Sequence, residues 1–127
     1  AGDSLERVGQ LSMGATVRHV AVEGTRVAVA LGESGVRLFD ARDPAAPVEQ
    51  LHWNDARFAY DVALSPRRLF VAAGSEGLYV LDASGGSRLV LGLARDLGFV
   101  IRVATVGADT YALDRTGPSL HRIATQV

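Results

Sequence analysis

The sequence contains a long internal repeat, and this repeat limits the folds that the chain can adopt. Residues 20–41 align without a gap with residues 62–83, and nine of the 22 aligned pairs are identical. Most of the other pairs exchange one apolar residue for another, as in Val27 and Leu69. A third, more divergent copy begins at Val103. A repeat of this length is typical either of helical repeats or of four-stranded propeller blades.

The repeated segments have the pattern of β-strands and lack helical periodicity. Segments such as 26–31, 69–73 and 78–81 are short and rich in β-branched or aromatic residues, and glycines separate them. Their apolar runs are nearly continuous and do not alternate, which indicates strands that are buried on both faces. Sheets that are stacked as propeller blades bury their strands in this way. The predicted fold is therefore an all-β propeller.

Each copy of the repeat is predicted to form one antiparallel blade of four strands. The predicted strands are 17–22, 26–31, 36–41 and 48–53 in the first copy, 60–64, 69–73, 78–83 and 88–93 in the second, and 101–105, 110–113 and 120–125 in the third. The third copy lacks a fourth strand, whereas the segment from Leu5 to Leu11 resembles residues 48–51 in pattern. We therefore predict a single unit of three blades. It comprises a displaced outer strand (1–15) that closes a blade, two repeats (16–58 and 59–99) and a degenerate third repeat (100–127).

Three blades are too few to close a ring, because propellers typically contain four to eight. A chain of this kind would expose apolar blade faces and a free sheet edge, both of which favour association. We therefore expect a homodimer that completes a ring of about six blades. In this dimer the strand from Leu5 to Leu11 of each copy closes the last blade of the other. The alternative is that the sequence is a fragment of a longer propeller protein.

Three segments of the second copy resemble the LVIVD repeat of bacterial β-propellers: YDVALS at 60–65, LFVAAG at 69–74 and GLYVLD at 77–82. The first copy adds DARDPAAP at 40–47, which is similar to the link into the outer strand in that family, whereas the second copy has no proline at this point. The resemblance covers roughly residues 16–106 and concerns structural motifs. It implies a propeller, commonly of a secreted or surface protein, and hence an extracellular or periplasmic location. It carries no shared active site.

The residues directly before the repeated Val-Ala pair are candidates for a binding site. They are His19 in the first copy, Asp61 in the second and Arg102 in the third, with Arg18 and Tyr60 beside them. Equivalent positions at the start of the innermost strands would place them near one mouth of the central channel. Such a group of side chains suits an anion, a sugar or a polar peptide. The alternative is that these residues pair with each other across blades, as buried charges usually do.

The link after the first outer strand supplies a second group of candidates. Trp53 is the only tryptophan, and Asn54 and Asp55 follow it. An exposed tryptophan beside polar residues suits sugar stacking or a contact with a protein. The alternative is that Trp53 fills a gap between blades.

The sequence lacks the common motifs of catalytic and cofactor sites. It has no Gly-x-Ser-x-Gly elbow, no Walker loop, no Gly-x-Gly-x-x-Gly segment and no cysteine. His19, His52 and His121 are widely separated, so we predict no metal site and no cofactor. Asp40 and Asp82 end equivalent strands, and we predict that they form turns and not a carboxylate pair.

Charge and hydropathy argue against nucleic-acid and membrane partners. The 13 basic and 14 acidic residues give a net charge of −1, and no polybasic run is present. The apolar stretch 20–31 is interrupted by Glu23 and Arg26, so it does not span a bilayer. We therefore favour a non-enzymatic module that binds a protein or glycan through the loops at one channel mouth. Two alternatives stay open: an architectural part of a larger secreted propeller protein, and a hydrolase or lyase with its site at the channel mouth.

Overall fold

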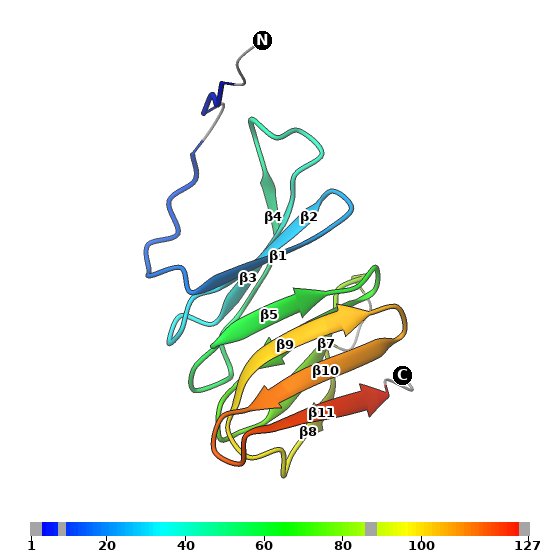
Figure 1. Cartoon of the computed structure of the whole chain (residues 1–127). Helices are drawn as coiled ribbons and strands as arrows, with labels where there is room; N and C mark the ends of the chain where they lie inside the picture. The colour runs from blue at the N-terminus through cyan, green and yellow to red at the C-terminus, as the bar shows by residue number, and fades with distance from the viewer. Residues whose placement is uncertain (1–3, 8–9, 86–88, 125–127) are drawn as a thin grey trace.

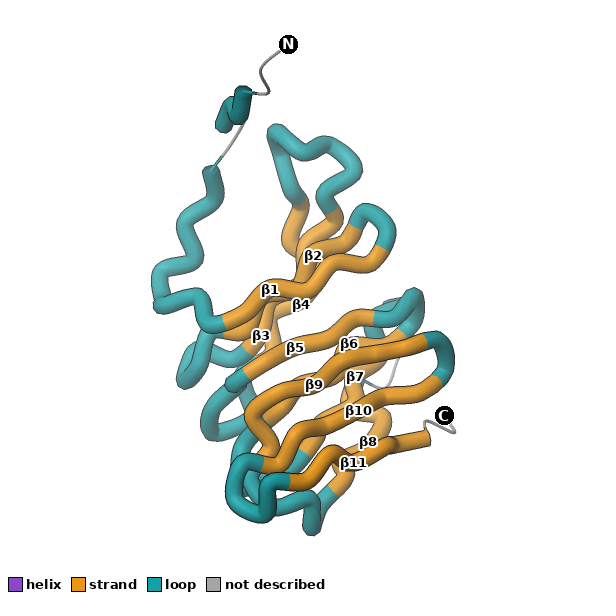
Figure 2. The backbone as a smooth tube through the Cα atoms, in the orientation of Figure 1, coloured by secondary structure: helices purple, strands orange, loops and turns teal. Residues whose placement is uncertain are grey.

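The computed structural model describes residues 4–7, 10–85 and 89–124. These residues form eleven β-strands and no helix (Figure 1, Figure 2). The strands are β1 (His19–Glu23), β2 (Arg26–Ala30), β3 (Val36–Asp40), β4 (Val48–Trp53), β5 (Asp61–Leu64), β6 (Arg68–Ala72), β7 (Leu78–Asp82), β8 (Val90–Ala94), β9 (Val100–Val106), β10 (Asp109–Asp114) and β11 (Ser119–Ala124). Each overlaps one of the eleven predicted strands of the three repeats, which confirms that the chain is all-β. Residues 8, 9, 88 and 125, which the sequence analysis placed in strands, lie outside the described residues.

The strands are arranged in three antiparallel sheets, one for each copy of the repeat. The orders are β1-β2-β3-β4, β5-β6-β7-β8 and β11-β10-β9, so every strand pairs with its neighbour in the chain. The first two sheets therefore have four strands and the third has three among the described residues. Each sheet is a simple meander, which short turns can connect without any crossover.

The first two copies of the repeat also pair their strands in the same register. Val20 faces Val29 in the first sheet, and the residues aligned with them, Val62 and Val71, face each other in the second. The pairing of the last two strands is irregular at equivalent positions in both sheets. The sequence repeat is therefore also a structural repeat, down to the position of a β-bulge.

The second sheet lies between two apolar layers. One layer joins buried side chains of the first and second sheets, and the other joins those of the second and third. Strand β5 is consequently buried along its whole length, whereas half-buried and exposed side chains alternate along β1. The predicted burial on both faces is therefore found along β5 and β6 and in parts of β2, β3 and β7, but not in β1. Each fully buried Leu, Val or Phe contributes about 1.5–3 kcal/mol to stability.

Backbone hydrogen bonds join each of the first two sheets to the chain segment that leads into the next sheet. Gly32 N donates to Ala59 O over 3.1 Å, and Ala59 N donates to Gly32 O over 2.9 Å. Gly74 and Val100 form the same pair, over 2.9 and 3.0 Å. Both glycines have positive φ angles, +63° and +62°, which residues with a Cβ rarely adopt. These turns therefore fix the links 54–60 and 95–99 at one end of the sheets.

The N-terminal segment forms no strand within its described residues, 4–7 and 10–18. Met13 and Ala15 pack on the outer face of the first sheet, and Leu5 is fully exposed. Figure 1 shows this segment, in blue, beside the first sheet, whereas β11 lies at the far side of the third sheet. Within one chain, therefore, the described residues of this segment do not pair with β11. Its exchange with a second copy stays a prediction.

Candidate functional site

The starts of the three innermost strands lie together at one end of the sheets. In the first sheet His19 faces Ala30, Ala30 faces Val36, and Val36 faces Trp53. The start of β1, the β2–β3 turn and the end of β4 therefore share one edge. Strand β5 contacts both β1 and β9, and Figure 2 shows the three strands side by side. His19 and Asp61, which begin β1 and β5, and Arg102, near the start of β9, are thus gathered in one place.

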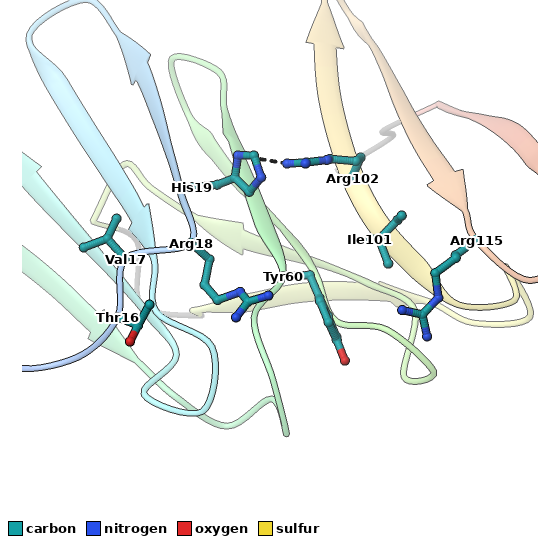
Figure 3. A pocket seen from close by; sticks show the side chains of 8 residues that line it. All are labelled: Thr16, Val17, Arg18, His19, Tyr60, Ile101, Arg102 and Arg115. Carbon is teal, nitrogen blue, oxygen red and sulfur yellow. Dashed lines mark hydrogen bonds between the residues drawn. The ribbon is translucent and has the colours of Figure 1, made fainter.

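The side chains of His19, Asp61 and Arg102 contact one another at this end. Arg102 Nη1 lies 3.0 Å from His19 Nδ1, as the dashed line in Figure 3 shows. Asp61 Oδ1 lies 3.6 Å from the same nitrogen. A guanidinium group only donates hydrogen bonds, so Nδ1 of His19 accepts in its contact with Arg102. The three side chains that the repeat singled out therefore pair across sheets, as the alternative interpretation expected.

Asp61 has a structural role in addition to this contact. It is buried, and its Oδ2 accepts a hydrogen bond from Val103 N over 3.0 Å. Its Oδ1 accepts from Val62 N over 2.9 Å. The carboxylate thus ties β5 to β9 through the backbone, and its charge is compensated by N–H donors.

A pocket of about 410 Å³ opens beside these residues. Its lining includes His19, Tyr60 and Arg102, together with Arg18 and Arg115 (Figure 3). The predicted candidates His19, Tyr60 and Arg102 therefore line one cavity. Their role in binding a ligand stays a prediction.

A row of three aromatic rings lies along this end of the molecule. The ring centroids of Phe58 and Tyr60 are 4.5 Å apart, and those of Tyr60 and Phe99 are 5.3 Å apart. The guanidinium of Arg18 lies 5.2 Å from the centroid of Phe58, and that of Arg115 lies 4.2 Å from the centroid of Phe99. Both distances are in the range of cation–π contacts. The rings therefore position a cation at each end of the row.

The glycines of the neighbouring turns leave room for these rings. A Cβ at Gly74 would lie 2.8 Å from Tyr60 Cε2 and 2.9 Å from Phe99 Cζ. A Cβ at Gly32 would likewise lie 2.9 Å from Phe58 Cζ. The glycines therefore serve both the turn and the close packing of the aromatic row.

The interpretation of Trp53 as an exposed binding residue is wrong. Its side chain is only 3% exposed and belongs to the core layer between the first and second sheets. Its ring meets that of Tyr79 edge to face, with centroids 4.9 Å apart. Trp53 thus fills the gap between two sheets, as the alternative expected. Asn54 and Asp55 are exposed, but neither lines the pocket beside His19.

The prediction that Asp40 and Asp82 form turns is confirmed. Asp40 Oδ1 accepts a hydrogen bond from Arg42 N over 3.0 Å, and Asp82 Oδ1 accepts one from Ser84 N over 2.8 Å. Both are bonds to a backbone group two residues further on, which is the geometry of an Asx turn. The hydrogen bonds from Arg42 also lower the pKa of Asp40 below its ordinary value.

Asp114 organises the β10–β11 turn of the third sheet, which corresponds to the β2–β3 and β6–β7 turns of the other sheets, a role that the sequence analysis did not find. Its buried carboxylate accepts hydrogen bonds from Phe99 N over 2.8 Å, from Thr116 N over 2.9 Å and from Gly117 N over 3.2 Å. The hydrogen bond from Phe99 N makes the largest contribution to lowering the pKa of Asp114 below its ordinary value. Asp114 therefore holds both Phe99 and the turn that carries Arg115.

The sequence analysis also missed Phe58, Phe99 and Arg115. Phe58 and Phe99 each stand three residues before the repeated position of Asp61 and Arg102, so the repeat itself carried this signal. Arg115 has no such signal, because it lies in a turn that the third copy does not share with the others.

The comparisons do not assign the chain to a family. No family model matches it, and no curated protein matches it. The resemblance to LVIVD repeats therefore stays a prediction that concerns the motifs in residues 16–106. Within the described residues no membrane-spanning helix is found, and no group of three or more acidic or histidine side chains is placed to hold a metal ion.

Proposed function

We propose that the chain is a non-enzymatic, three-blade portion of a β-propeller of the LVIVD-repeat type, that a second copy completes its ring, and that the pocket end binds a protein or glycan. We also propose that the protein is bacterial and is located outside the cytoplasm. The observation that carries the proposal concerns the outer face of the first sheet, which is apolar and exposed along β1, whereas Met13 and Ala15 cover its part along β2 and β3; the place equivalent to the exposed part is buried in the second sheet.

The outer face of the first sheet carries Val20 and Val22, which are 58% and 66% exposed. In the alignment of the two copies these positions correspond to Val62 and Leu64, which are 3% and 4% exposed because the second sheet packs there against the first. The first sheet thus has the same apolar pattern as a face that is covered elsewhere in the chain. Exposed apolar faces of this kind favour association.

The third sheet has the opposite face exposed. Leu113 pairs with Leu120, as Ala72 pairs with Leu78 in the second sheet. Leu78 is fully buried against the third sheet, whereas its counterpart Leu120 is 66% exposed. A second copy whose first sheet covered this face would repeat the packing that already occurs twice within the chain.

The outer face of the first sheet and the exposed face of the third sheet are different surfaces. Within the chain, a face of the first kind packs against a face of the second kind wherever two sheets meet. Two copies related by a two-fold axis would bury both faces twice and leave none exposed, which closes the assembly. Two copies joined through only one such contact would leave one outer face of a first sheet and one exposed face of a third sheet uncovered. The proposal therefore favours the closed pair over an open chain of copies.

Deleting residues 1–11 should weaken the pairing of two copies by about tenfold or more. In the proposed exchange this segment adds backbone hydrogen bonds to the free edge of β11, and each contributes a net ~1 kcal/mol. The deletion retains Met13 and Ala15, which pack on the first sheet, so the fold of each copy should persist. The measurement is the concentration dependence of mass by light scattering. An unchanged dissociation constant would contradict the strand exchange.

A further inference from the structure

Three arginine side chains line the pocket without an acidic partner. They are Arg18, Arg102 and Arg115, and the lining contains no Asp or Glu. In the parts of the chain that the structure describes, none of the three forms an ion pair. Because the whole chain has a net charge of −1, this positive charge is a local feature of the pocket end.

The aromatic row positions two of these cations but leaves their donors free. Arg18 lies over Phe58 and Arg115 lies over Phe99. A cation–π contact is an attraction between the charge and the ring and does not itself occupy the N–H groups in hydrogen bonds, so they stay available as donors. Figure 3 shows the two guanidinium groups on either side of Tyr60. The donors are thus arranged around the pocket before any ligand enters.

The carboxylate of Asp61, which contacts His19, does not neutralise this cluster. Asp61 is buried behind His19, and its oxygens accept hydrogen bonds from Val62 N and Val103 N. Asp61 is not part of the pocket lining. Arg102 donates to the ring of His19 over 3.0 Å, and within the described residues it forms no ion pair.

The size and chemistry of the pocket fit a small acidic group or chain end. Its volume of about 410 Å³ is within the range of small-molecule sites, roughly 300–1,000 Å³. Carboxylate and phosphate groups can accept two parallel N–H bonds from one guanidinium, which gives both strength and orientation. Arginine is suited to this task because its planar group is always charged and is weakly hydrated.

We propose that the pocket recognises oxyanion groups of an acidic ligand, which Arg18, Arg102 and Arg115 bind between them. This inference rests on the proposed function and specifies the ligand chemistry of the same site. Whichever kind of molecule carries them, the recognised groups are carboxylates or phosphates. Because Arg18 and Arg115 lie on opposite sides of Tyr60, the ligand bears at least two such groups.

Titration calorimetry of the full chain with citrate, pyrophosphate and lactose tests this proposal. We expect one or both of the anions to bind, and neutral lactose not to bind. Stronger binding of citrate would assign the site to carboxylates, and stronger binding of pyrophosphate would assign it to phosphates. Arg18→Gln and Arg115→Gln should each weaken anion binding by about tenfold or more, because each removes a charge-assisted hydrogen-bond pair. Added salt should weaken it further.

Arg42→Gln is the matched control. Arg42 is 79% exposed and pairs with Asp40 at the opposite end of the first sheet, so its loss should leave anion affinity unchanged. Absence of binding for both anions, or equal losses in Arg42→Gln and Arg115→Gln, would overturn the proposal. The mass of the same samples separates the two claims. A dimer that binds no anion overturns this inference alone, and a single chain that binds anions overturns only the ring.

Discussion

Val22→Asp is expected to halve the mass of the protein in solution while the chain stays folded. Val22 is 66% exposed in the single chain, so a carboxylate there meets water and does not disturb the core. In the proposed ring the same position is covered by the third sheet of the second copy. An unpaired charge buried there costs several kcal/mol, which corresponds to a loss of affinity of about a hundredfold or more. Light scattering measures the mass, and circular dichroism measures the retained strand content.

Two controls decide what such a result means. Val48→Asp changes a residue of similar exposure, 64%, on the other face of the first sheet, and should leave the mass unchanged. Leu64→Asp changes the counterpart of Val22 in the second sheet, where the side chain is 4% exposed, and should unfold the chain. If Val22→Asp retained the full mass of the native protein, the outer face of the first sheet would not be the interface.

Gly77→Ala is expected to destabilise each copy by about 2–4 kcal/mol. Gly77 has a φ of +106°, and a Cβ there would lie 2.1 Å from the carbonyl oxygen of Ala94. This neighbour is backbone and cannot rotate away, so the β6–β7 turn would have to shift. Because this turn also carries the backbone pair between Gly74 and Val100, the shift would loosen the contact between the second and third sheets. Denaturant unfolding measures the loss.

Gly92→Ala is the matched control for this variant. Gly92 lies within β8, it does not have a positive φ, and no atom lies within 4 Å of the position of its added Cβ. The change should therefore alter the free energy of unfolding by less than about 1 kcal/mol, since alanine mainly restricts the unfolded chain. Equal effects of the two substitutions would show that the turn geometry at Gly77 does not limit stability.

The sequence predicted the strands well because two copies of one pattern constrain each other. Val20 and Val62 occupy the same place in two sheets, so the register of one copy is also that of the other. The third copy departs where Asp114 replaces an apolar residue and organises the turn through its side chain. A turn that depends on such side-chain bonds leaves no periodic signal, and Arg115 was missed for this reason.

Burial at the ends of strands was harder to predict than the strands themselves. The sequence left two interpretations of Trp53, an exposed binding residue, because polar residues follow it, and a residue that fills a gap between blades. It stands two residues after Leu51 and therefore on the same face of β4. Its partner across the layer, Tyr79, comes from another sheet, and only the folded chain brings the two together. The gathering of His19, Asp61 and Arg102 was predicted correctly, because it follows from the repeat alone.

The mass of the native chain in solution tests the central claim most directly. Multi-angle light scattering across a dilution series should give twice the chain mass of 13.4 kDa at the higher concentrations, because only a second copy covers both open faces. A mass of 13.4 kDa throughout the series would contradict the claim that two copies complete the ring.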